Sequence, residues 1–402
     1  MRYCIIGEKL GHSFSKDIHT DCGLNYDINE VKREELPSFI KNCPFDGFNV
    51  TIPYKTEIIK YLDEIDENAK SIGAVNTVVK RDDKLYGYNT DIFGMEKLLK
   101  KIGINLKDKV VMILGSGGTC KTATALCKIK GAKKIYNLSR SGEINYQNYH
   151  ERNDVEVIIN TTPVGMFPNN GEKLIELKKL PNLIGVIDCV YNPLKTALVL
   201  EAERLNMPCA GGLYMLVGQA FGAQEIWLNK EISIRVIDEY YEKLLRQKRN
   251  IVLMGMPSCG KSTIGKLVAE KLGREFIDTD KLIEEKENRS IERIFSEDGE
   301  EYFRALEKEV VREVSKKNSS IIAVGGGAPV FEENRWALRQ NACIVYIKRE
   351  LSYLVSDGRP LSKSEGIGAL YEKRKGIYES FADYTVYNNG DILEATKEII
   401  NL

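Results

Sequence analysis

An apolar stretch that runs directly into a glycine-rich loop sets the narrowest limits on the fold. Residues 250–254 (NIVLM) predict a buried β-strand, and residues 255–262 (GMPSCGKS) match the pattern G-x-x-x-x-G-K-[ST]. In such a loop the backbone N–H groups cradle phosphates, Lys261 reaches the β- and γ-phosphates, and the hydroxyl of Ser262 binds Mg²⁺. The strand and loop, followed by a helix, predict a nucleotide-binding domain with a parallel sheet.

A second glycine-rich loop, at residues 115–120 (GSGGTC), also follows an apolar run and precedes a helical pattern. A helix N-terminus in this setting suits the pyrophosphate of a dinucleotide, although Cys120 stands where G-x-G-x-x-G has its last glycine. The next predicted strand, 134–138, ends at Ser139, Arg140 and Ser141. An arginine between hydroxyls favours the 2′-phosphate of NADP, while Glu143 keeps NAD open as an alternative.

Composition bounds the class of protein. A length of 402 residues predicts two to three domains. Lys plus Arg and Asp plus Glu both number 58, so the zero net charge argues against nucleic-acid or membrane-surface partners. Nine cysteines without a Cys-x-x-Cys pair argue against a disulfide framework. With no apolar run of about 18 residues and a glycine at Gly7, too early for a signal peptide, we expect a cytoplasmic α/β protein.

Four short polar segments in the first hundred residues share small hydroxyl and amide side chains. They are 11–15 (GHSFS), 47–55 (GFNVTIPYK), 73–77 (GAVNT) and 87–91 (GYNTD). Each segment alone is typical of a turn. Together, with one ammonium at Lys55 and one carboxylate at Asp91, they predict a cleft that binds a polyol.

With these motifs, residues 1–245 resemble shikimate dehydrogenase. The resemblance also rests on 160–166 (NTTPVGM), 188–193 (DCVYNP) and 212–219 (GLYMLVGQ). It implies a substrate-binding α/β domain at 1–92, completed by 211–245, around a Rossmann NADP domain at 93–210. It also implies a catalytic pair, Lys55 and Asp91. The implied substrate contacts are Ser13, Ser15, Thr51, Asn76, Tyr191 and Gln219, and the implied nucleotide contacts are Gly115, Ser116, Gly117, Gly118, Thr119, Ser139, Arg140 and Gly212.

Residues 250–402 resemble shikimate kinase through the P-loop and the segments 276–280 (FIDTD), 299–307 (GEEYFRALE), 325–327 (GGG) and 359–361 (RPL). The resemblance implies Lys261 and Asp280 as catalytic residues. It implies substrate contacts at Asp280, Arg304, Gly326 and Arg374. It implies ATP contacts at Gly255, Ser258, Gly260, Lys261, Ser262, Thr263 and Arg359, the last in a lid at 359–366, and Mg²⁺ ligands at Ser262 and Asp278.

The two resemblances together predict one bifunctional enzyme. Its first half is expected to reduce 3-dehydroshikimate to shikimate with NADPH, and its second half to phosphorylate the 3-hydroxyl with ATP. A predicted helix at 232–245 and a basic linker at 246–249 join the halves. Two alternatives stay open: an NAD-dependent quinate/shikimate dehydrogenase fused to a kinase, and a sensor that binds these metabolites without turnover. The sequence leaves the oligomeric state open.

Overall fold

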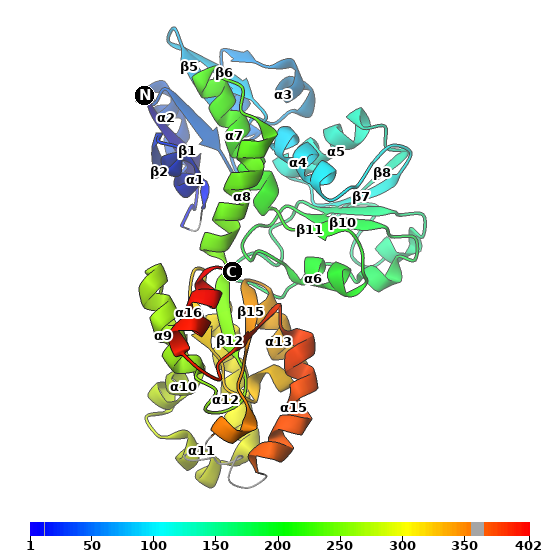
Figure 1. Cartoon of the computed structure of the whole chain (residues 1–402). Helices are drawn as coiled ribbons and strands as arrows, with labels where there is room; N and C mark the ends of the chain where they lie inside the picture. The colour runs from blue at the N-terminus through cyan, green and yellow to red at the C-terminus, as the bar shows by residue number, and fades with distance from the viewer. Residues whose placement is uncertain (12, 355–365) are drawn as a thin grey trace. The chain divides into compact units, whose positions relative to one another are not determined.

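The computed structural model describes residues 1–402 except residue 12 and residues 355–365 (Figure 1). The chain divides into two compact units, Met1–Leu244 and Leu245–Leu402. The boundary lies within helix α8 (Ile234–Lys248), which begins two residues later and ends three residues later than the helix predicted from the sequence. Residues 246–248 of the expected linker are therefore the last turn of α8.

The first unit contains two sheets, of which the first is mixed. Its strand order is β2-β1-β3-β5-β6-β4. Strands β1, β2 and β3 are parallel, while β5 is antiparallel to both β3 and β6. The strands are β1 (Arg2–Gly7), β2 (Asn25–Glu30), β3 (Gly47–Val50), β4 (Glu64–Ile65), β5 (Thr77–Arg81) and β6 (Lys84–Tyr88).

The second sheet is parallel throughout, with the order β11-β10-β9-β7-β8. The strands are β7 (Val110–Leu114), β8 (Lys134–Leu138), β9 (Val157–Asn160), β10 (Gly185–Asp188) and β11 (Cys209–Ala210). Strand order reverses between β7 and β9. In open α/β sheets ligands bind at this point, beyond the carboxyl ends of the strands.

Helix α7 (Leu213–Leu228) brings the chain back to the first sheet after the second sheet is complete. It is apolar and buried on nearly all sides, as expected for a helix enclosed within a core. Trp227 stacks on Tyr3 with ring centroids 4.6 Å apart, and its Nε1 donates to Val78 O at 2.9 Å. The other helices of this unit are α1 (Ser15–Asp21), α2 (Leu36–Lys41), α3 (Glu67–Ile72), α4 (Asp91–Lys101), α5 (Gly118–Ile129) and α6 (Ala197–Arg204).

The second unit is a parallel sheet between two layers of helices. Its strand order is β13-β14-β12-β15-β16, with β12 (Asn250–Met254) at the centre. The other strands are β13 (Phe276–Asp278), β14 (Ile321–Ala323), β15 (Ala342–Lys348) and β16 (Tyr384–Tyr387). The helices are α9 (Lys261–Leu272), α10 (Thr279–Glu287), α11 (Ile291–Glu297), α12 (Gly299–Val314), α13 (Glu332–Arg339), α15 (Ile367–Phe381) and α16 (Ile392–Ile400).

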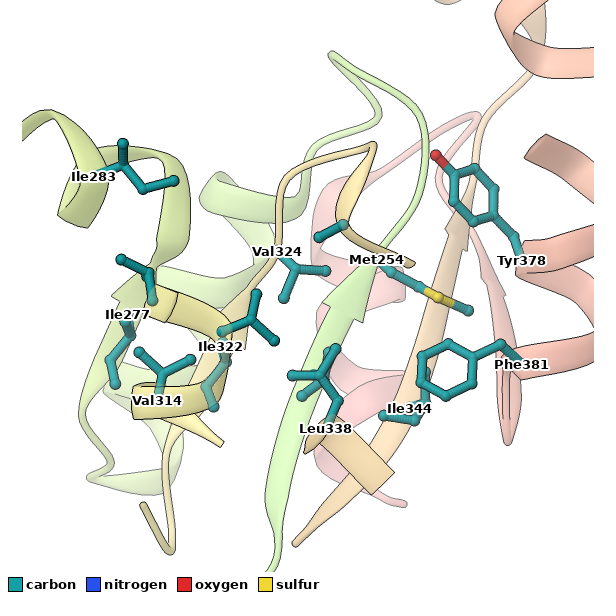
Figure 2. Packing of buried hydrophobic residues seen from close by; sticks show 14 of the residues in the cluster. Met254, Ile277, Ile283, Val314, Ile322, Val324, Leu338, Ile344, Tyr378 and Phe381 are labelled. Atoms are coloured by element: carbon teal, nitrogen blue, oxygen red, sulfur yellow. The ribbon is translucent and has the colours of Figure 1, made fainter. Parts of the chain in front are cut away.

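Strand β12 shows why a continuous apolar run forms the central strand. Alternate residues of a strand point to opposite faces, so Val252 and Met254 enter one core while Ile251 and Leu253 enter the other. Figure 2 shows the first of these cores, where Met254 lies near Phe381 and Tyr378 of α15. The expected α/β class with parallel sheets is confirmed. Within the described part of the chain, no helix has the length and apolar character needed to cross a membrane.

Candidate active sites

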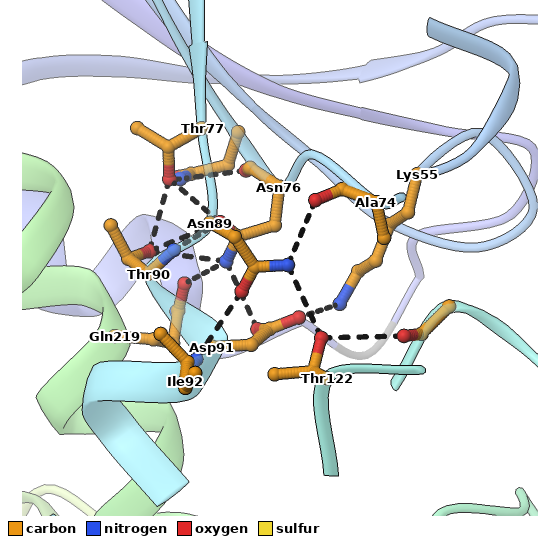
Figure 3. Close-up of polar contacts among 12 residues, drawn as sticks. Lys55, Ala74, Asn76, Thr77, Asn89, Thr90, Asp91, Ile92, Thr122 and Gln219 are labelled. Atoms are coloured by element: carbon orange, nitrogen blue, oxygen red, sulfur yellow. Dashed lines mark hydrogen bonds and ion pairs between the residues drawn. The ribbon is translucent and has the colours of Figure 1, made fainter. Parts of the chain in front are cut away.

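The ammonium of Lys55 forms a short ion pair with Asp91, with Nζ and Oδ2 2.6 Å apart (Figure 3). The two side chains are largely buried, 13% and 6% exposed respectively. Lys55 follows Tyr54, which is fully buried and donates its hydroxyl to Val31 O at 2.6 Å. The segment that carries the lysine is therefore anchored in the core.

Asp91 is the first residue of α4, where the positive end of the helix dipole stabilises a carboxylate. Its second oxygen, Oδ1, accepts from Asn76 Nδ2 at 3.0 Å. Asn76 Nδ2 also lies 3.3 Å from Gln219 Oε1 of α7, and Asn76 Oδ1 accepts from the Thr90 backbone N–H at 2.7 Å. The fold thus joins four of the predicted residues, Lys55, Asn76, Asp91 and Gln219, in one hydrogen-bonded network.

Asn89 connects this network to the helix of the dinucleotide loop. Its side-chain oxygen accepts from Ile92 N–H at 3.2 Å, and its amide donates to Ala74 O at 2.9 Å and to Thr122 Oγ1 of α5 at 3.2 Å (Figure 3). Sequence reasoning gave Asn89 no role and missed Thr122. The available signals were the place of Asn89 beside Asp91 and the spacing of Thr122 four residues after Gly118.

The dinucleotide loop is built for an anion. Gly117 is the N-cap of α5 and no side chain caps that helix end, so the first backbone N–H groups remain available as donors. A β-carbon on Gly118 would lie 3.1 Å from Lys55 Cβ, so this loop contacts the lysine directly. Gly115 has φ +121°, and a β-carbon there would lie 2.7 Å from Thr161 Oγ1. These glycines fit a dinucleotide pyrophosphate that reaches close to Lys55.

The segment after β8 lies beside this loop, because Gly115 N–H donates to Leu138 O at 2.8 Å. Ser139 is half-buried and Arg140 is exposed. Glu143 is also exposed and lies 3.8 Å from Arg152. Among the described residues, the carboxylate of Glu143 is thus paired with the guanidinium of Arg152.

The other predicted substrate contacts lie elsewhere in the first unit: Ser13 precedes α1, Ser15 is the first residue of α1, Thr51 follows β3 and Tyr191 follows β10. Ser13 Oγ accepts from the Ser15 N–H at 3.2 Å. Burial raises the pKa of the Tyr191 phenol, against a smaller lowering by its hydrogen bond to Ser13. Among the described residues, no hydrogen bond or ion pair joins Ser13, Ser15, Thr51 or Tyr191 to the Lys55–Asp91 pair.

The loop after β10 nevertheless lies within electrostatic reach of the ion pair. Burial and the charges of Asp188 and Asp91 raise the pKa of the Cys189 thiol, while the charge of Lys55 opposes them. Gly212 packs against this loop, since its N–H donates to Val190 O at 2.8 Å.

In the second unit, the P-loop borders a cavity of about 320 Å³. Lys261 is buried, and its Nζ donates to Gly255 O at 3.1 Å and to Met256 O at 3.0 Å. Gly260 has φ +101°, and a β-carbon there would lie 2.5 Å from Asn388 Nδ2. The predicted residues that line this cavity are Ser258, Gly260, Lys261, Ser262 and Thr263.

Sequence reasoning missed several residues that line this cavity, among them Arg349 and Asn388, which donate to Ser258 O at 3.2 Å and to Cys259 O at 2.8 Å. They follow β15 and β16, so strand topology is the signal that places them beside the P-loop. Arg359 and the rest of the expected lid at 359–366, apart from Gly366, lie outside the described residues.

A second cavity of about 490 Å³ is lined by the predicted substrate contacts of the kinase half, Asp280, Arg304, Gly326 and Arg374. The predicted Mg²⁺ ligands, Ser262 and Asp278, line it as well. Ser262 Oγ donates to Asp278 Oδ2 at 2.6 Å, and the other oxygen of Asp278 accepts from the Asp280 N–H at 3.1 Å. Because Ser262 lines both cavities, the P-loop borders each of the two binding spaces.

Glu307 is a buried carboxylate in this cavity to which sequence reasoning gave no role. Its Oε2 accepts from Arg304 NH1 at 2.8 Å, and the pKa of its carboxyl is raised by burial, against the lowering effect of Arg304. A β-carbon on Gly325 would lie 2.6 Å from Asp280 Oδ1 and 2.9 Å from Glu307 Oε1. The sequence signal for Glu307 was its position three residues after Arg304, which places both side chains on one face of α12.

Comparisons with known proteins agree with both halves. The model of the shikimate dehydrogenase substrate binding domain matches residues 5–78. The NADP(+) shikimate dehydrogenase of Clostridium beijerinckii is 38% identical over 259 residues, covering 60% of this chain and 96% of that protein. The chain belongs to the shikimate dehydrogenase family. That of Methanococcus maripaludis is 36% identical over 272 residues, covering 60% of this chain and 96% of its own length.

Solved structures and the second half complete the comparison. Shikimate dehydrogenase 1 from Peptoclostridium difficile matches with a TM-score of 0.57 at 38% identity, covering 61% of this chain and 98% of its own. The Thermus thermophilus enzyme in complex with NADP(H) and shikimate matches with a TM-score of 0.54 at 26% identity, covering 60% and 99%. The shikimate kinase model matches residues 257–402. The chain is therefore a bifunctional shikimate-pathway enzyme, with a shikimate dehydrogenase half (residues 1–244) and a shikimate kinase half (residues 245–402).

Proposed function

We propose that the dehydrogenase half reduces 3-dehydroshikimate to shikimate and that the kinase half phosphorylates the 3-hydroxyl of shikimate. The observation that carries the proposal is the buried Lys55–Asp91 pair in contact with Gly118, which puts an ammonium beside a dinucleotide loop. In the kinase half, a cavity lined by two arginines and Asp280 adjoins the P-loop. A small, anionic polyol fits both sets of side chains.

In the dehydrogenase half, NADPH when bound supplies a hydride to the carbonyl carbon of the substrate. Lys55 donates a proton to the carbonyl oxygen as negative charge develops there, so the carbonyl becomes a hydroxyl. Asp91 holds the lysine at 2.6 Å and keeps it oriented. Asn76 holds the aspartate from the other side, and Gln219 in turn accepts from Asn76. We assign the amide groups of both residues to the substrate hydroxyls.

Four hydroxyl-bearing residues complete the proposed substrate site. The side chains of Ser13 and Tyr191 are hydrogen-bonded to each other. Ser15 donates its N–H to Ser13 Oγ, and Thr51 lies four residues before Lys55. Hydroxyl groups can donate to a carboxylate and exchange hydrogen bonds with a polyol. We assign these four side chains to the carboxylate and hydroxyls of the substrate.

In the kinase half, ATP when bound supplies the γ-phosphoryl group. Lys261 neutralises charge on the phosphates, while Asp280 accepts the proton of the acceptor hydroxyl. Arg304 and Arg374 clamp the acceptor carboxylate, because a guanidinium makes two parallel hydrogen bonds to such a group. Gly326 allows close approach of the acceptor ring, since it carries no side chain where Arg374 and Pro257 converge.

Mg²⁺ fits the oxygen pair of Ser262 and Asp278. The hydroxyl and the carboxylate lie 2.6 Å apart beside the P-loop, and oxygen donors are those that Mg²⁺ prefers. We assign Ser262 as the direct ligand and Asp278 as the residue that orients it. The ion, when bound, supplies positive charge to the β- and γ-phosphates.

A coupled assay tests both reactions at once. The purified chain is incubated with 3-dehydroshikimate, NADPH, ATP and Mg²⁺, and the products are followed by mass spectrometry. Shikimate is expected without ATP, and shikimate 3-phosphate with it. Formation of shikimate without its phosphate would remove the kinase assignment, and no oxidation of NADPH would remove the dehydrogenase assignment.

The exposed Arg140 gives a prediction on the coenzyme. Arg140→Ala is expected to lower kcat/KM for NADPH about 10- to 100-fold, because a charge-assisted hydrogen bond to the 2′-phosphate is lost. NADH, which lacks that phosphate, is expected to be used as by the wild type. Steady-state kinetics with both coenzymes checks this, with Arg235→Ala on α8 as the surface control. An equal loss with both coenzymes would contradict a contact of Arg140 with the 2′-phosphate. A wild-type preference for NADH and quinate would favour the NAD-dependent alternative.

Glu307 gives a prediction on the acceptor. Glu307→Ala is expected to raise KM for shikimate about tenfold with KM for ATP unchanged, because Arg304 loses its buried hydrogen-bond partner. Glu307→Gln keeps an acceptor oxygen and is expected to lose less. Glu300 contacts the same arginine but is 51% exposed, so Glu300→Ala is the matched control with little effect. Equal effects of the two alanine variants on KM would contradict the role of Glu307.

A further inference from the structure

Asp188, the last residue of β10, is a fully buried carboxyl group at the carboxyl edge of the second sheet. Its partner in the register of β9 is Asn160. Asp188 Oδ1 accepts from Asn160 Nδ2 at 2.9 Å and from the Val190 N–H at 3.0 Å, and Oδ2 lies 2.6 Å from Thr196 Oγ1. These partners are an amide, a backbone N–H and a hydroxyl, and all three are neutral.

On the β9 side, the side chain of Asn160 connects Asp188 to the turn beside the dinucleotide loop. Asn160 Oδ1 accepts from both the backbone N–H and the hydroxyl of Thr162, at 3.0 and 2.7 Å. The preceding Thr161 donates its hydroxyl to Leu114 O at 2.6 Å. Asp188 thereby helps to fix the residues that border Gly115.

On the β10 side, Val190 connects Asp188 to two residues of the proposed active site. Its N–H is held by Asp188, and its carbonyl accepts from the Gly212 N–H at 2.8 Å. A β-carbon on Gly212 would lie 2.2 Å from Cys189 O, so this close approach of the two segments leaves no room for a side chain at residue 212. Tyr191 follows Val190 directly. The substrate contact proposed for Tyr191 and the nucleotide contact that the resemblance implies for Gly212 therefore depend on one buried carboxyl group.

We propose that Asp188 is a positioning residue of the dehydrogenase half, which holds the residues after β9, the residues after β10 and Gly212 in place as a neutral carboxylic acid. The proposal rests on the proposed function, because it concerns the same reaction. The proton of the acid fits between Asp188 Oδ2 and Thr196 Oγ1, since Oδ1 already accepts two N–H groups. An anion at this position would be buried without a positive partner, which is costly.

The electrostatics agree with this protonation state. Burial raises the pKa of Asp188 from its ordinary value of 3.8 to about 7, although its three hydrogen bonds act in the opposite direction. The groups that face it are Asn160 from β9, Thr196 from α6 and the Cys189 thiol, whose pKa burial also raises. Lys195, the neighbour of Thr196, is paired with Glu203 at 2.7 Å. The carboxyl group is therefore neutral below about pH 7 and becomes an anion above it.

The sign of the pH effect follows from linkage. Between about pH 4 and pH 7 the folded chain keeps a proton at Asp188 that the unfolded chain loses. The contribution of Asp188 to stability is therefore full below about pH 4 and is lost as the pH rises to about 7. Over this range the folding constant of the dehydrogenase half falls by up to about tenfold per pH unit through this group.

Three proteins test the proposal: the wild type, Asp188→Asn and Asp188→Ala. An amide copies the neutral acid, because its oxygen accepts from Asn160 and Val190 while its NH₂ donates to Thr196. At pH 6, Asp188→Asn is expected to keep kcat/KM within about threefold, and Asp188→Ala to lose about 10- to 100-fold. From pH 6 to 8.5 the wild type is expected to lose kcat relative to Asp188→Asn.

Two further readouts keep the test independent of substrate turnover. Calorimetry with NADP⁺ measures nucleotide binding. Unfolding measured from pH 5 to 7 gives the slope of the unfolding free energy against pH, which Asp188→Asn is expected to make flatter. The kinase activity of each variant shows that the chain is intact. Equal impairment of the asparagine and alanine variants at pH 6, or identical pH dependences of wild type and Asp188→Asn in both kcat and unfolding, would overturn the proposal. A wild type that binds NADP⁺ but does not reduce 3-dehydroshikimate would instead contradict the proposed function.

Discussion

Replacing Lys55 by alanine is expected to lower kcat for reduction of 3-dehydroshikimate by about 10³-fold, because the proton donor at the developing alkoxide is lost. Asp91 keeps its hydrogen bond from Asn76 and its place at the start of α4, so the helix is expected to remain folded. Shikimate phosphorylation is expected to stay at the wild-type rate, because its residues belong to the other compact unit. Both rates are measured on one preparation.

Lys60→Ala is the matched control for this experiment. Lys60 lies five residues further along the chain and is 60% exposed, where its pair with Glu57 contributes little. NADP⁺ binding by calorimetry separates a loss of chemistry from a loss of the nucleotide site. A Lys55→Ala protein that binds NADP⁺ normally and still reduces the substrate within tenfold of the wild type would refute the role of Lys55 as proton donor.

Replacing Lys261 by alanine is expected to have the reverse pattern. The kinase rate should fall by about 10³-fold, because the charge that reaches the β- and γ-phosphates is removed. Lys261 also donates to the carbonyls of Gly255 and Met256, so KM for ATP is expected to rise as the loop loses these contacts. Reduction of 3-dehydroshikimate is expected to be unchanged.

Lys266→Ala controls for a change of charge on the same helix, since Lys266 is an exposed residue of α9. Phosphorylation is measured at saturating shikimate with ATP varied, so that kcat and KM for ATP are obtained separately. Loss of both activities in Lys261→Ala, or in Lys55→Ala, would contradict the assignment of the two reactions to separate sites.

Sequence reasoning was most effective where the chemistry comes from consecutive residues. Strand β12 begins and ends where its apolar run predicts, and the P-loop follows it directly. A phosphate-binding loop uses the backbone N–H groups of neighbouring residues, so its geometry is encoded locally. Helix α8 was predicted less well, because its last turn consists of the basic residues expected as a linker. Polar residues do not by themselves end a helix whose other face is buried at Ile237, Tyr240 and Leu244.

In the candidate sites too, motifs identified some residues, while others were recognised only from their surroundings in the fold. Lys55 and Asp91 were paired through motifs 36 residues apart, and the structure places them 2.6 Å apart. Glu307 and Asp188 were given no function, because a carboxylate side chain is ordinarily expected at the protein surface. Their importance comes from burial, which depends on strands and helices distant in the chain.

The family, the two nucleotide-binding loops and the identity of the chemical groups can be read from contiguous motifs of the sequence. How these groups act on one another depends on the tertiary structure. It brought Asn76, Asp91 and Gln219 into one network, placed Gly118 against Lys55, and enclosed Asp188 among neutral partners. The physical reason is that hydrogen-bond geometry and desolvation depend on neighbours in space, which residues far apart in the chain supply only after folding.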